Sequence, residues 1–133
     1  MLSLVTGSIG LSRTFAVTFD ETGHIAVVGF CADVSFPDGP VVNDGLWHSV
    51  VVTYNGAGTI SIYIDRALVA TSSSFTDTCG GALTSIQYDT AGTDNWLGTD
   101  AYGDKHYVGD LRNVLFYDYA LSSHTIITAP APV

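Results

Sequence analysis

The stretch of sequence that decides the fold is Asp44-Gly45-Leu46-Trp47-His48-Ser49-Val50-Val51-Val52-Thr53-Tyr54-Asn55-Gly56. Residues 47–54 are rich in β-branched and aromatic side chains, which favour strands. The pair Asn55-Gly56 accepts the positive φ angles of a tight turn. Residues 59–65 follow with isoleucine at alternate positions, and a turn at Asp65-Arg66 leads into residues 67–70. The sequence therefore predicts a three-stranded antiparallel meander.

Further strands are predicted on both sides of this meander. Residues 13–19 alternate apolar and polar side chains, and residues 24–31 are apolar on both faces, so the two predict a hairpin whose second strand is central. Residues 35–45 and 71–81 are dominated by turn-forming and small polar residues, which predicts loops. The remaining predicted strands are residues 83–87, 95–98 and 107–117. This pattern of short strands indicates an antiparallel sandwich or barrel.

Two local features are predicted near the end of the chain. The apolar phase of residues 107–117 slips between Leu111 and Val114, which predicts a β-bulge near Arg112-Asn113. Residues 120–126 predict one helical turn, with Ser122 or Ser123 as its N-cap.

The composition limits the classes of protein to which the chain can belong. The length of 133 residues suits one domain, and 47% hydrophobic with 13% charged residues excludes intrinsic disorder. The net charge of −9 makes the chain acidic and argues against binding nucleic acid or an anionic membrane surface. The first residues have no basic segment, and no segment reaches the roughly 20 apolar residues of a membrane span. We therefore expect a soluble chain without a signal peptide.

The stretch at residues 44–56 resembles the central segment of laminin G-like jelly-roll domains, which belong to the concanavalin A-like lectin/glucanase superfamily. Later segments match the same family in order: Tyr63-Ile64-Asp65-Arg66, Leu97-Gly98, Tyr107-Val108-Gly109-Asp110-Leu111 and Tyr117-Asp118-Tyr119-Ala120-Leu121-Ser122. The resemblance implies an all-β, antiparallel β-sandwich of jelly-roll type. We assign residues 1–127 to this single domain and expect residues 128–133 to form a flexible Ala/Pro tail.

Three departures from the family pattern are informative. Arg66 occupies a turn position where the family usually has Gly, so a positive φ there costs about 1 kcal/mol. Arg112 stands where an Asp is common. The family also carries further strands before a segment like residues 15–30, and a sandwich without them has an exposed edge. The low charge and high apolar content favour a homo-oligomer that shares sheet edges and so completes the sandwich.

The residues argue against an enzyme. Glycosidases need two carboxylates that flank the bond, but Glu21 is the single Glu and no predicted strand presents two acids on one face. The four histidines (His24, His48, His106 and His124) have no nucleophile-elbow motif near them. Cys31 and Cys79 are either a disulfide or two buried free thiols. In the family motif, Trp47 and His48 are expected to have structural roles.

Residues 89–106 contain the candidate ligand and metal sites. An aromatic side chain that covers a sugar ring, next to polar groups for its hydroxyls, is offered by Asp94, Asn95, Trp96, Tyr102 and His106. Calcium prefers several oxygen ligands, and the candidates are Asp89, Asp94, Asp100 and Asp104. Some laminin G-like domains bind calcium at such a rim. The alternatives are that these aspartates only shape turns and that Trp96 packs inward while Leu97 faces out.

We therefore predict a non-catalytic recognition module that binds glycans, with calcium as a candidate cofactor. The alternative is a structural or assembly module that binds protein, or its own copies, through sheet faces and edges. An extracellular location is expected if the chain is part of a larger secreted protein.

Overall fold

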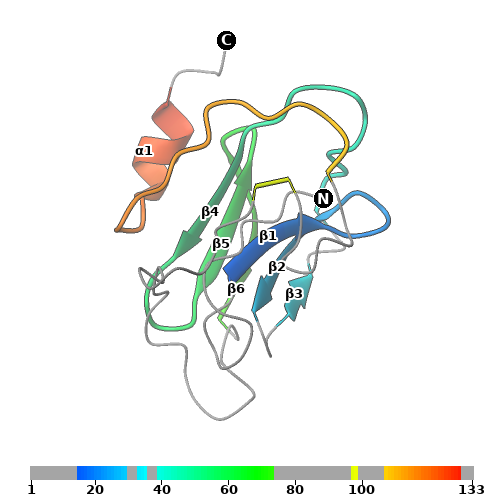
Figure 1. Cartoon of the computed structure of the whole chain (residues 1–133). Helices are drawn as coiled ribbons and strands as arrows, with labels where there is room; N and C mark the ends of the chain where they lie inside the picture. The colour runs from blue at the N-terminus through cyan, green and yellow to red at the C-terminus, as the bar shows by residue number, and fades with distance from the viewer. Residues whose placement is uncertain (1–14, 30–32, 36–38, 74–96, 99–106, 130–133) are drawn as a thin grey trace.

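The computed structural model describes residues 15–29, 33–35, 39–73, 97–98 and 107–129. Within these ranges the elements are the strands β1 (Phe15–Phe19), β2 (Ile25–Gly29), β3 (Asp33–Ser35), β4 (Val50–Tyr54), β5 (Ile60–Ile64) and β6 (Ala67–Ser72), and the helix α1 (Ser123–Thr128). The strands form two antiparallel sheets, arranged as two layers in Figure 1. The predicted all-β sandwich is confirmed.

The first sheet has the strand order β1-β2-β3. Its register pairs Val17 with Val27 and Phe19 with Ile25. The predicted hairpin and the central place of β2 are therefore confirmed. Ala26 and Val27 of β2 are both buried. Because successive residues of a strand point to opposite faces, both faces of β2 are covered at this point. The short strand β3 was not predicted, because three residues are too few to show an alternation. Its last residue, Ser35, falls in a predicted loop.

The second sheet has the strand order β4-β5-β6 and confirms the predicted meander. Val50 pairs with Ile64 and Val52 with Ile62, so these two valines of β4 share one face with isoleucines of β5. The prediction for β4 began too early, because the strand starts at Val50 and not at residue 47. Strand β6 continues to Ser72, into residues that were predicted as loop.

The turns of the meander follow from their side chains. Asn55 Oδ1 accepts hydrogen bonds from the backbone N–H groups of Ala57 (2.8 Å) and Thr59 (3.0 Å). At the next turn Asp65 has a φ of 50° and Arg66 a φ of 70°. The predicted turn is present, and Arg66 has the positive φ at which its Cβ brings a steric cost that a Gly would avoid.

The core lies between the two layers. Val17, Ile25 and Val27 come from the first sheet, and they pack with the three isoleucines of β5: Ile60, Ile62 and Ile64. Burial of such side chains contributes about 1.5–3 kcal/mol each. Phe19, Val50, Val52 and Tyr54 pack against this cluster but are only partly buried.

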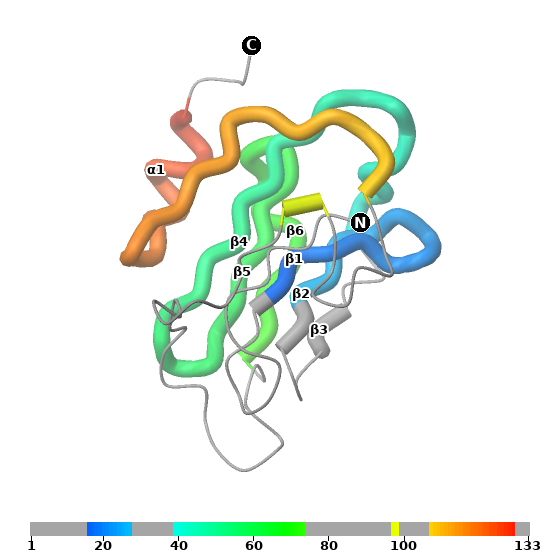
Figure 2. Tube along the Cα trace, viewed as in Figure 1, coloured from blue at the N-terminus to red at the C-terminus, as the bar shows by residue number. Residues whose placement is uncertain are grey.

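The predicted strands at residues 107–117 and 95–98 are wrong for the residues that the structure describes. Residues 107–119 form no strand, and residues 97–98 form a bend. The physical reason is the backbone: Gly109 has a φ of 150° and Asn113 a φ of 54°, and both interrupt an extended ladder. Asn113 lies at the predicted bulge position, so the irregularity was located correctly but is larger than a bulge. Figure 2 shows this segment, in orange, passing over β4 to reach α1.

Helix α1 confirms the predicted helical turn near the end of the chain. Ser122 is its N-cap, and its Oγ accepts a hydrogen bond from Thr125 N at 3.1 Å. Thr128, the first residue of the predicted tail, belongs to the helix, and its hydroxyl donates to the carbonyl oxygen of His124 at 2.8 Å. In the described ranges there is no helix with the length and hydrophobicity of a membrane span.

Candidate functional site

The ligand and metal residues predicted from the sequence lie outside the described residues. This holds for the whole set: Asp89, Asp94, Asn95, Trp96, Asp100, Tyr102, Asp104 and His106. Cys31 and Cys79 lie outside it as well. Their roles stay predictions. The described residues form a separate candidate site.

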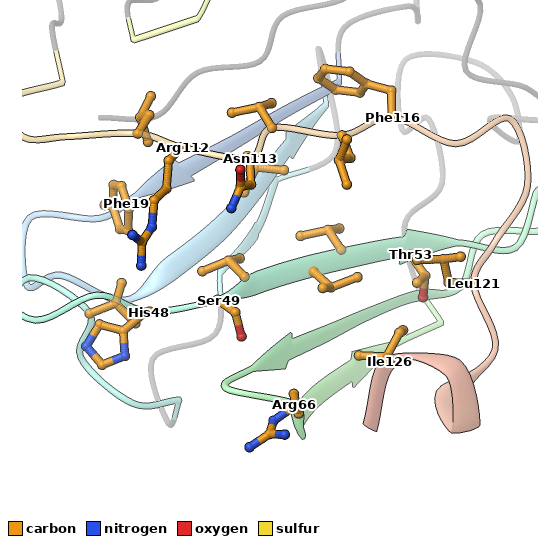
Figure 3. A pocket seen from close by; sticks show the side chains of 18 of the residues that line it. Phe19, His48, Ser49, Thr53, Arg66, Arg112, Asn113, Phe116, Leu121 and Ile126 are labelled. Carbon is orange, nitrogen blue, oxygen red and sulfur yellow. The ribbon is translucent and has the colours of Figure 1, made fainter. Parts of the chain in front are cut away.

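A groove separates the inner face of β4 from residues 107–121. It has a volume of about 1370 Å³ and is lined mainly by apolar side chains, among them Phe19, Val50, Val52 and Leu115. Figure 3 shows the segment and β4 on opposite sides of it, with Phe116 and Leu121 toward one end and Arg112 and His48 toward the other. In the described part of the chain the first sheet ends at β1, so no further strand of that layer covers β4. The groove therefore lies beside β1, where residues 107–121 face β4.

A pair of large side chains lies at the end of the groove near His48. Trp47 is 52% exposed, and the guanidinium carbon of Arg112 lies 4.3 Å from the centroid of its ring. This distance is typical of a cation–π contact, for which Arg is well suited because its planar, weakly hydrated group can stack on an aromatic face. Within the described residues Arg112 makes no ion pair.

The residue that follows Trp47 belongs to a polar cluster, which we call the His48 clasp: Asp44, His48 and Asp65. The Nδ1–H of His48 donates to Asp65 Oδ2 at 2.8 Å, and its Nε2–H donates to Asp44 Oδ1 at 3.0 Å. Both ring nitrogens face a carboxylate, so the imidazolium form satisfies both contacts. Ser49 N also donates to Asp65 Oδ1 at 2.9 Å, and Asp65 N donates to Ser49 O at 2.9 Å. The clasp thus joins the segment before β4 to the β5–β6 turn.

The pKa values of the clasp residues move in opposite directions. Hydrogen bonds to Asp65 and then to Asp44 raise the pKa of His48, and partial burial opposes them. Partial burial raises the pKa of Asp65, but the bonds from His48 and Ser49 outweigh it, so the net pKa is lowered. The N–H of Leu46, followed by His48, lowers the pKa of Asp44. All three groups are therefore charged near pH 6.

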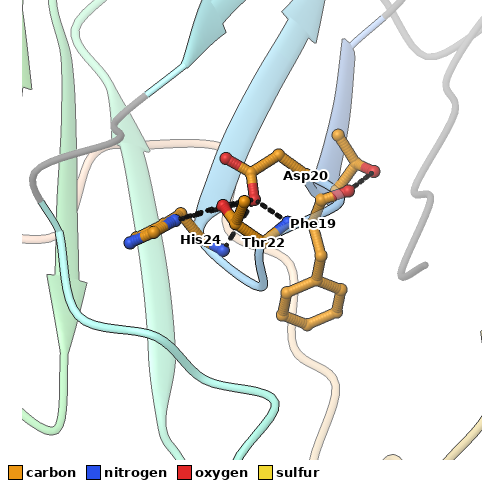
Figure 4. A network of polar contacts seen from close by, with 5 residues as sticks. Phe19, Asp20, Thr22 and His24 are labelled. Atoms are coloured by element: carbon orange, nitrogen blue, oxygen red, sulfur yellow. Dashed lines mark hydrogen bonds and ion pairs between the residues drawn. The ribbon is translucent and has the colours of Figure 1, made fainter.

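A second polar cluster shapes the β1–β2 turn, as Figure 4 shows. Asp20 Oδ1 accepts from the Thr22 hydroxyl (2.6 Å), Thr22 N (2.8 Å) and His24 N (3.0 Å). The Thr22 hydroxyl has one proton, so its 2.7 Å contact with His24 Nδ1 requires the proton of that ring nitrogen. The hydroxyl of Thr22 and the N–H of His24 lower the pKa of Asp20 to about 2. Asp20 is a turn former, as are Asp44 and Asn55.

The described residues include no group of three side chains arranged to hold a metal ion. In the His48 clasp the ring nitrogens are occupied by carboxylates, which excludes metal ligation by His48 in this arrangement. The calcium prediction concerns residues 89–104 and is not addressed by these groups.

Large apolar side chains of residues 107–119 are exposed. The exposed fraction is 93% for Val108, 68% for Leu115, 51% for Phe116 and 63% for Tyr119. Tyr107 is better anchored, since its ring stacks on Phe19 with centroids 5.8 Å apart and its N–H donates to Gly98 O at 2.7 Å. An apolar surface of this kind marks an interaction site more often than an isolated exposed residue does.

The Trp47–Arg112 pair was not predicted, because the two residues are far apart in the chain. Trp47 was expected to be a core or rim residue, and its half-exposed side chain agrees with the rim. The one signal in the sequence was Arg112 itself, one of only 4 Lys+Arg residues, at a position where the resembling family commonly has Asp.

Comparisons with known proteins agree with this fold. A family model described as the concanavalin A-like lectin/glucanases superfamily matches residues 4–127. A crystal structure of an S-layer domain-containing protein (residues 221–444) from Clostridium thermocellum ATCC 27405 is similar, with a TM-score of 0.50 and 20% sequence identity. The match covers 92% of this chain and 58% of that one, so this chain spans little more than half of it. No curated protein matches the chain.

A non-catalytic binding or structural module fits this family and this fold. The family model covers nearly the whole chain, and the residues that carry the resemblance form the meander that the structure contains. The chain belongs to the concanavalin A-like lectin/glucanases superfamily.

Proposed function

We propose that the chain is a non-catalytic recognition module that binds a glycan in the groove between β4 and residues 107–121. The observation that carries this proposal is the groove itself, about 1370 Å³ in volume and largely apolar, with the half-exposed ring of Trp47 at one end. Ligand sites are concave and mostly apolar, with a few polar groups that fix orientation. The negative face of an aromatic ring suits the C–H groups of a sugar ring.

A polar side chain is available for the hydroxyl groups of such a ligand. Asn113 lines the groove, and in Figure 3 its side chain extends from residues 107–121 toward β4. The residues predicted from the sequence, with Asp94, Trp96 and Tyr102 at their centre, would extend this site. Calcium bound by Asp89, Asp94, Asp100 and Asp104 would assist binding, and this part of the proposal rests on the sequence alone.

The charge states of three described carboxylates, Asp20, Asp44 and Asp65, do not suit a general acid. A general acid for glycoside hydrolysis needs a raised pKa. Asp20, Asp44 and Asp65 all have lowered pKa values, because each accepts hydrogen bonds that favour its ionised form. These carboxylates shape turns and have no proton to donate near neutral pH.

The test is a glycan-array screen in calcium and again in chelator, with the folded state and solution mass of the protein checked first. We expect saturable binding that Trp47→Ala abolishes. Leu68→Ala is the matched control, since Leu68 is 53% exposed on β6 and does not line the groove. Loss of binding in chelator and in Asp94→Ala would support calcium assistance. Binding to no glycan, by a folded chain, would overturn the proposal.

The exposed side chains of residues 107–119 favour a second candidate, an assembly module that packs against its own copies. The occurrence of a similar fold in an S-layer domain-containing protein is consistent with it. The measurement is the solution mass over a range of concentrations. A concentration-dependent oligomer that Leu115→Asp dissociates would support assembly, whereas a monomer at all concentrations would exclude it.

A further inference from the structure

The short turn that carries Trp47 is closed by a single carboxylate oxygen. Asp44 Oδ1 accepts hydrogen bonds from Leu46 N at 2.8 Å and from His48 Nε2–H at 3.0 Å. The residues on either side of Trp47 are thus both bonded to Asp44. Gly45, Leu46 and Trp47 line the groove, so this closed turn forms part of its wall.

We propose that the proton on His48 controls the closure of this turn, and thereby the affinity of the groove for its ligand. When His48 is an imidazolium the turn is closed. When His48 is neutral, Asp44 is released and the wall around Trp47 loosens. This inference concerns the regulation of the proposed site and rests on the proposed function for its effect on binding. The change in the turn itself does not require a ligand.

The two ring nitrogens explain why one proton has this effect. Nδ1 of His48 lies 2.8 Å from Asp65 Oδ2, and Nε2 lies 3.0 Å from Asp44 Oδ1. An imidazolium donates from both nitrogens, whereas a neutral imidazole has one N–H and one lone pair. In the neutral ring one carboxylate therefore faces a lone pair, and neither group has a proton to share. One of the two contacts is then lost.

The contact with Asp44 is the one that we expect to break. Asp65 is held next to His48 by two further bonds, from Ser49 N to Asp65 Oδ1 and from Asp65 N to Ser49 O, both 2.9 Å long. These bonds keep Asp65 beside Nδ1, which retains its proton. In the described part of the chain, the hydrogen bonds of the Asp44 side chain reach only Leu46 and His48. Loss of the bond to His48 therefore opens the turn.

The charges around His48 set the pH range of this change. The charged groups on the surrounding segments are Asp20, Asp44, Asp65, Arg66, Asp110 and Arg112. Hydrogen bonds to Asp65 and then to Asp44 raise the pKa of His48 above its ordinary value of 6.5. The turn is therefore closed below about pH 6.5 and opens as the pH rises through the raised pKa.

The turn acts on the site through Trp47. The ring of Trp47 is 52% exposed and lies against Arg112, whose guanidinium carbon is 4.3 Å from the ring centroid. An aromatic side chain whose backbone is fixed before binding loses less conformational entropy when a ligand orders it. We therefore expect tighter binding with the turn closed, by about 2- to 10-fold, which is the range for ordering one side chain.

The experiment follows Trp47 and His48 by NMR in the same sample without ligand, from about pH 5 to 9. The indole N–H resonance of Trp47 is assigned with Trp47→Phe, and the ring resonances of His48 with His48→Gln. We expect the Trp47 resonance to shift with an apparent midpoint above pH 6.5 that equals the midpoint of His48. A Trp47 resonance that stays constant, or that moves with a different midpoint, would overturn the inference.

Variants test whether the contact with Asp44 transmits the change. In Asp44→Asn the side-chain amide can donate a hydrogen bond to the ring lone pair, so the turn stays closed when His48 is neutral. The Trp47 resonance should then keep its acidic position at every pH, although His48 still titrates. A resonance fixed at the alkaline position would contradict the role of Asp44. His124→Gln, on the exposed side of α1, is the matched control and should leave the pH profile of Trp47 unchanged.

Binding separates this inference from the proposed function. The probe is an uncharged oligosaccharide from the glycan array, so that pH changes only the protein. Its affinity should fall about 2- to 10-fold between pH 6 and 9, and Asp44→Asn should remove the fall. An affinity that is independent of pH would overturn the regulation of the site and leave the proposed function standing. A Trp47 resonance that titrates with His48, in a chain that binds no glycan, would overturn the proposed function and leave the change in the turn established.

Discussion

Replacement of His48 by Gln removes the charged link between the segment before β4 and the β5–β6 turn. His48 is 17% exposed, but the carboxylate of its partner Asp65 is 54% exposed, so solvent screens much of the attraction. We therefore expect the His48–Asp65 contact to contribute about 1 kcal/mol to the free energy of unfolding. In a domain of this size such a loss lowers the Tm by about 3–5 °C.

The pH dependence of this contribution has a definite sign. The pKa of His48 is raised above its ordinary value of 6.5, so its stabilisation is fully present below pH 6.5 and is lost as the pH rises through the raised pKa. The pKa of Asp65 is lowered from 3.8, so its contribution is present above pH 3.8 and is lost as the pH falls through the lowered pKa. The clasp is most stabilising between about pH 4 and 6.5.

The assay is thermal unfolding of the parent chain and His48→Gln, followed by circular dichroism from pH 4.5 to 9. The difference in Tm should be largest near pH 5–6 and should shrink as the pH rises above 6.5. His124→Gln is the matched control, because His124 is exposed on α1 and faces no described carboxylate. A difference in Tm that stays constant over the whole range, or grows with pH, would refute the reasoning.

The remaining predictions concern stability. Arg66→Gly should raise the free energy of unfolding by about 1 kcal/mol in urea denaturation, because Gly tolerates the φ of 70°. Arg66→Ala keeps the Cβ and should not raise the free energy of unfolding, so equal effects of the two substitutions would contradict this reasoning. Ile62→Ala should lower the free energy of unfolding by about 2–5 kcal/mol, since Ile62 is 1% exposed. Leu68→Ala, at an exposed site, should lower it by less than about 0.5 kcal/mol, and similar losses for the two would place the core elsewhere. Ser122→Ala should cost about 1 kcal/mol and speed hydrogen exchange at Thr125, and an unchanged exchange rate would argue against the cap.

Much of the fold was predictable because it depends on interactions between residues that are near in sequence. Alternation over residues 47–54 and 59–65, with Asn55-Gly56 between them, specifies a hairpin and its register. The same reasoning predicted the β1–β2 hairpin, the turn at Asp65-Arg66 and a cap at Ser122 or Ser123, of which the structure has Ser122. In each case the pattern and the turn chemistry favour the same structure.

The candidate site was much less predictable. The residues selected from the sequence, such as Asp94 and Trp96, lie outside the described residues, and their arrangement stays a prediction. The groove was not predicted, because it exists only where residues 107–121 pass β4 without forming a strand. Alternation indicates which side chains share a face, but it does not specify what covers that face.

The sequence by itself determined the strands of the meander, the first hairpin, the helix cap and the family, since short-range periodicity and turn residues carry that information. The tertiary structure decided that His48 meets Asp65 and that Trp47 meets Arg112. These contacts join residues from segments that are far apart in the sequence. They form because of how the two sheets and residues 107–121 pack in space, and a local sequence pattern does not specify that packing.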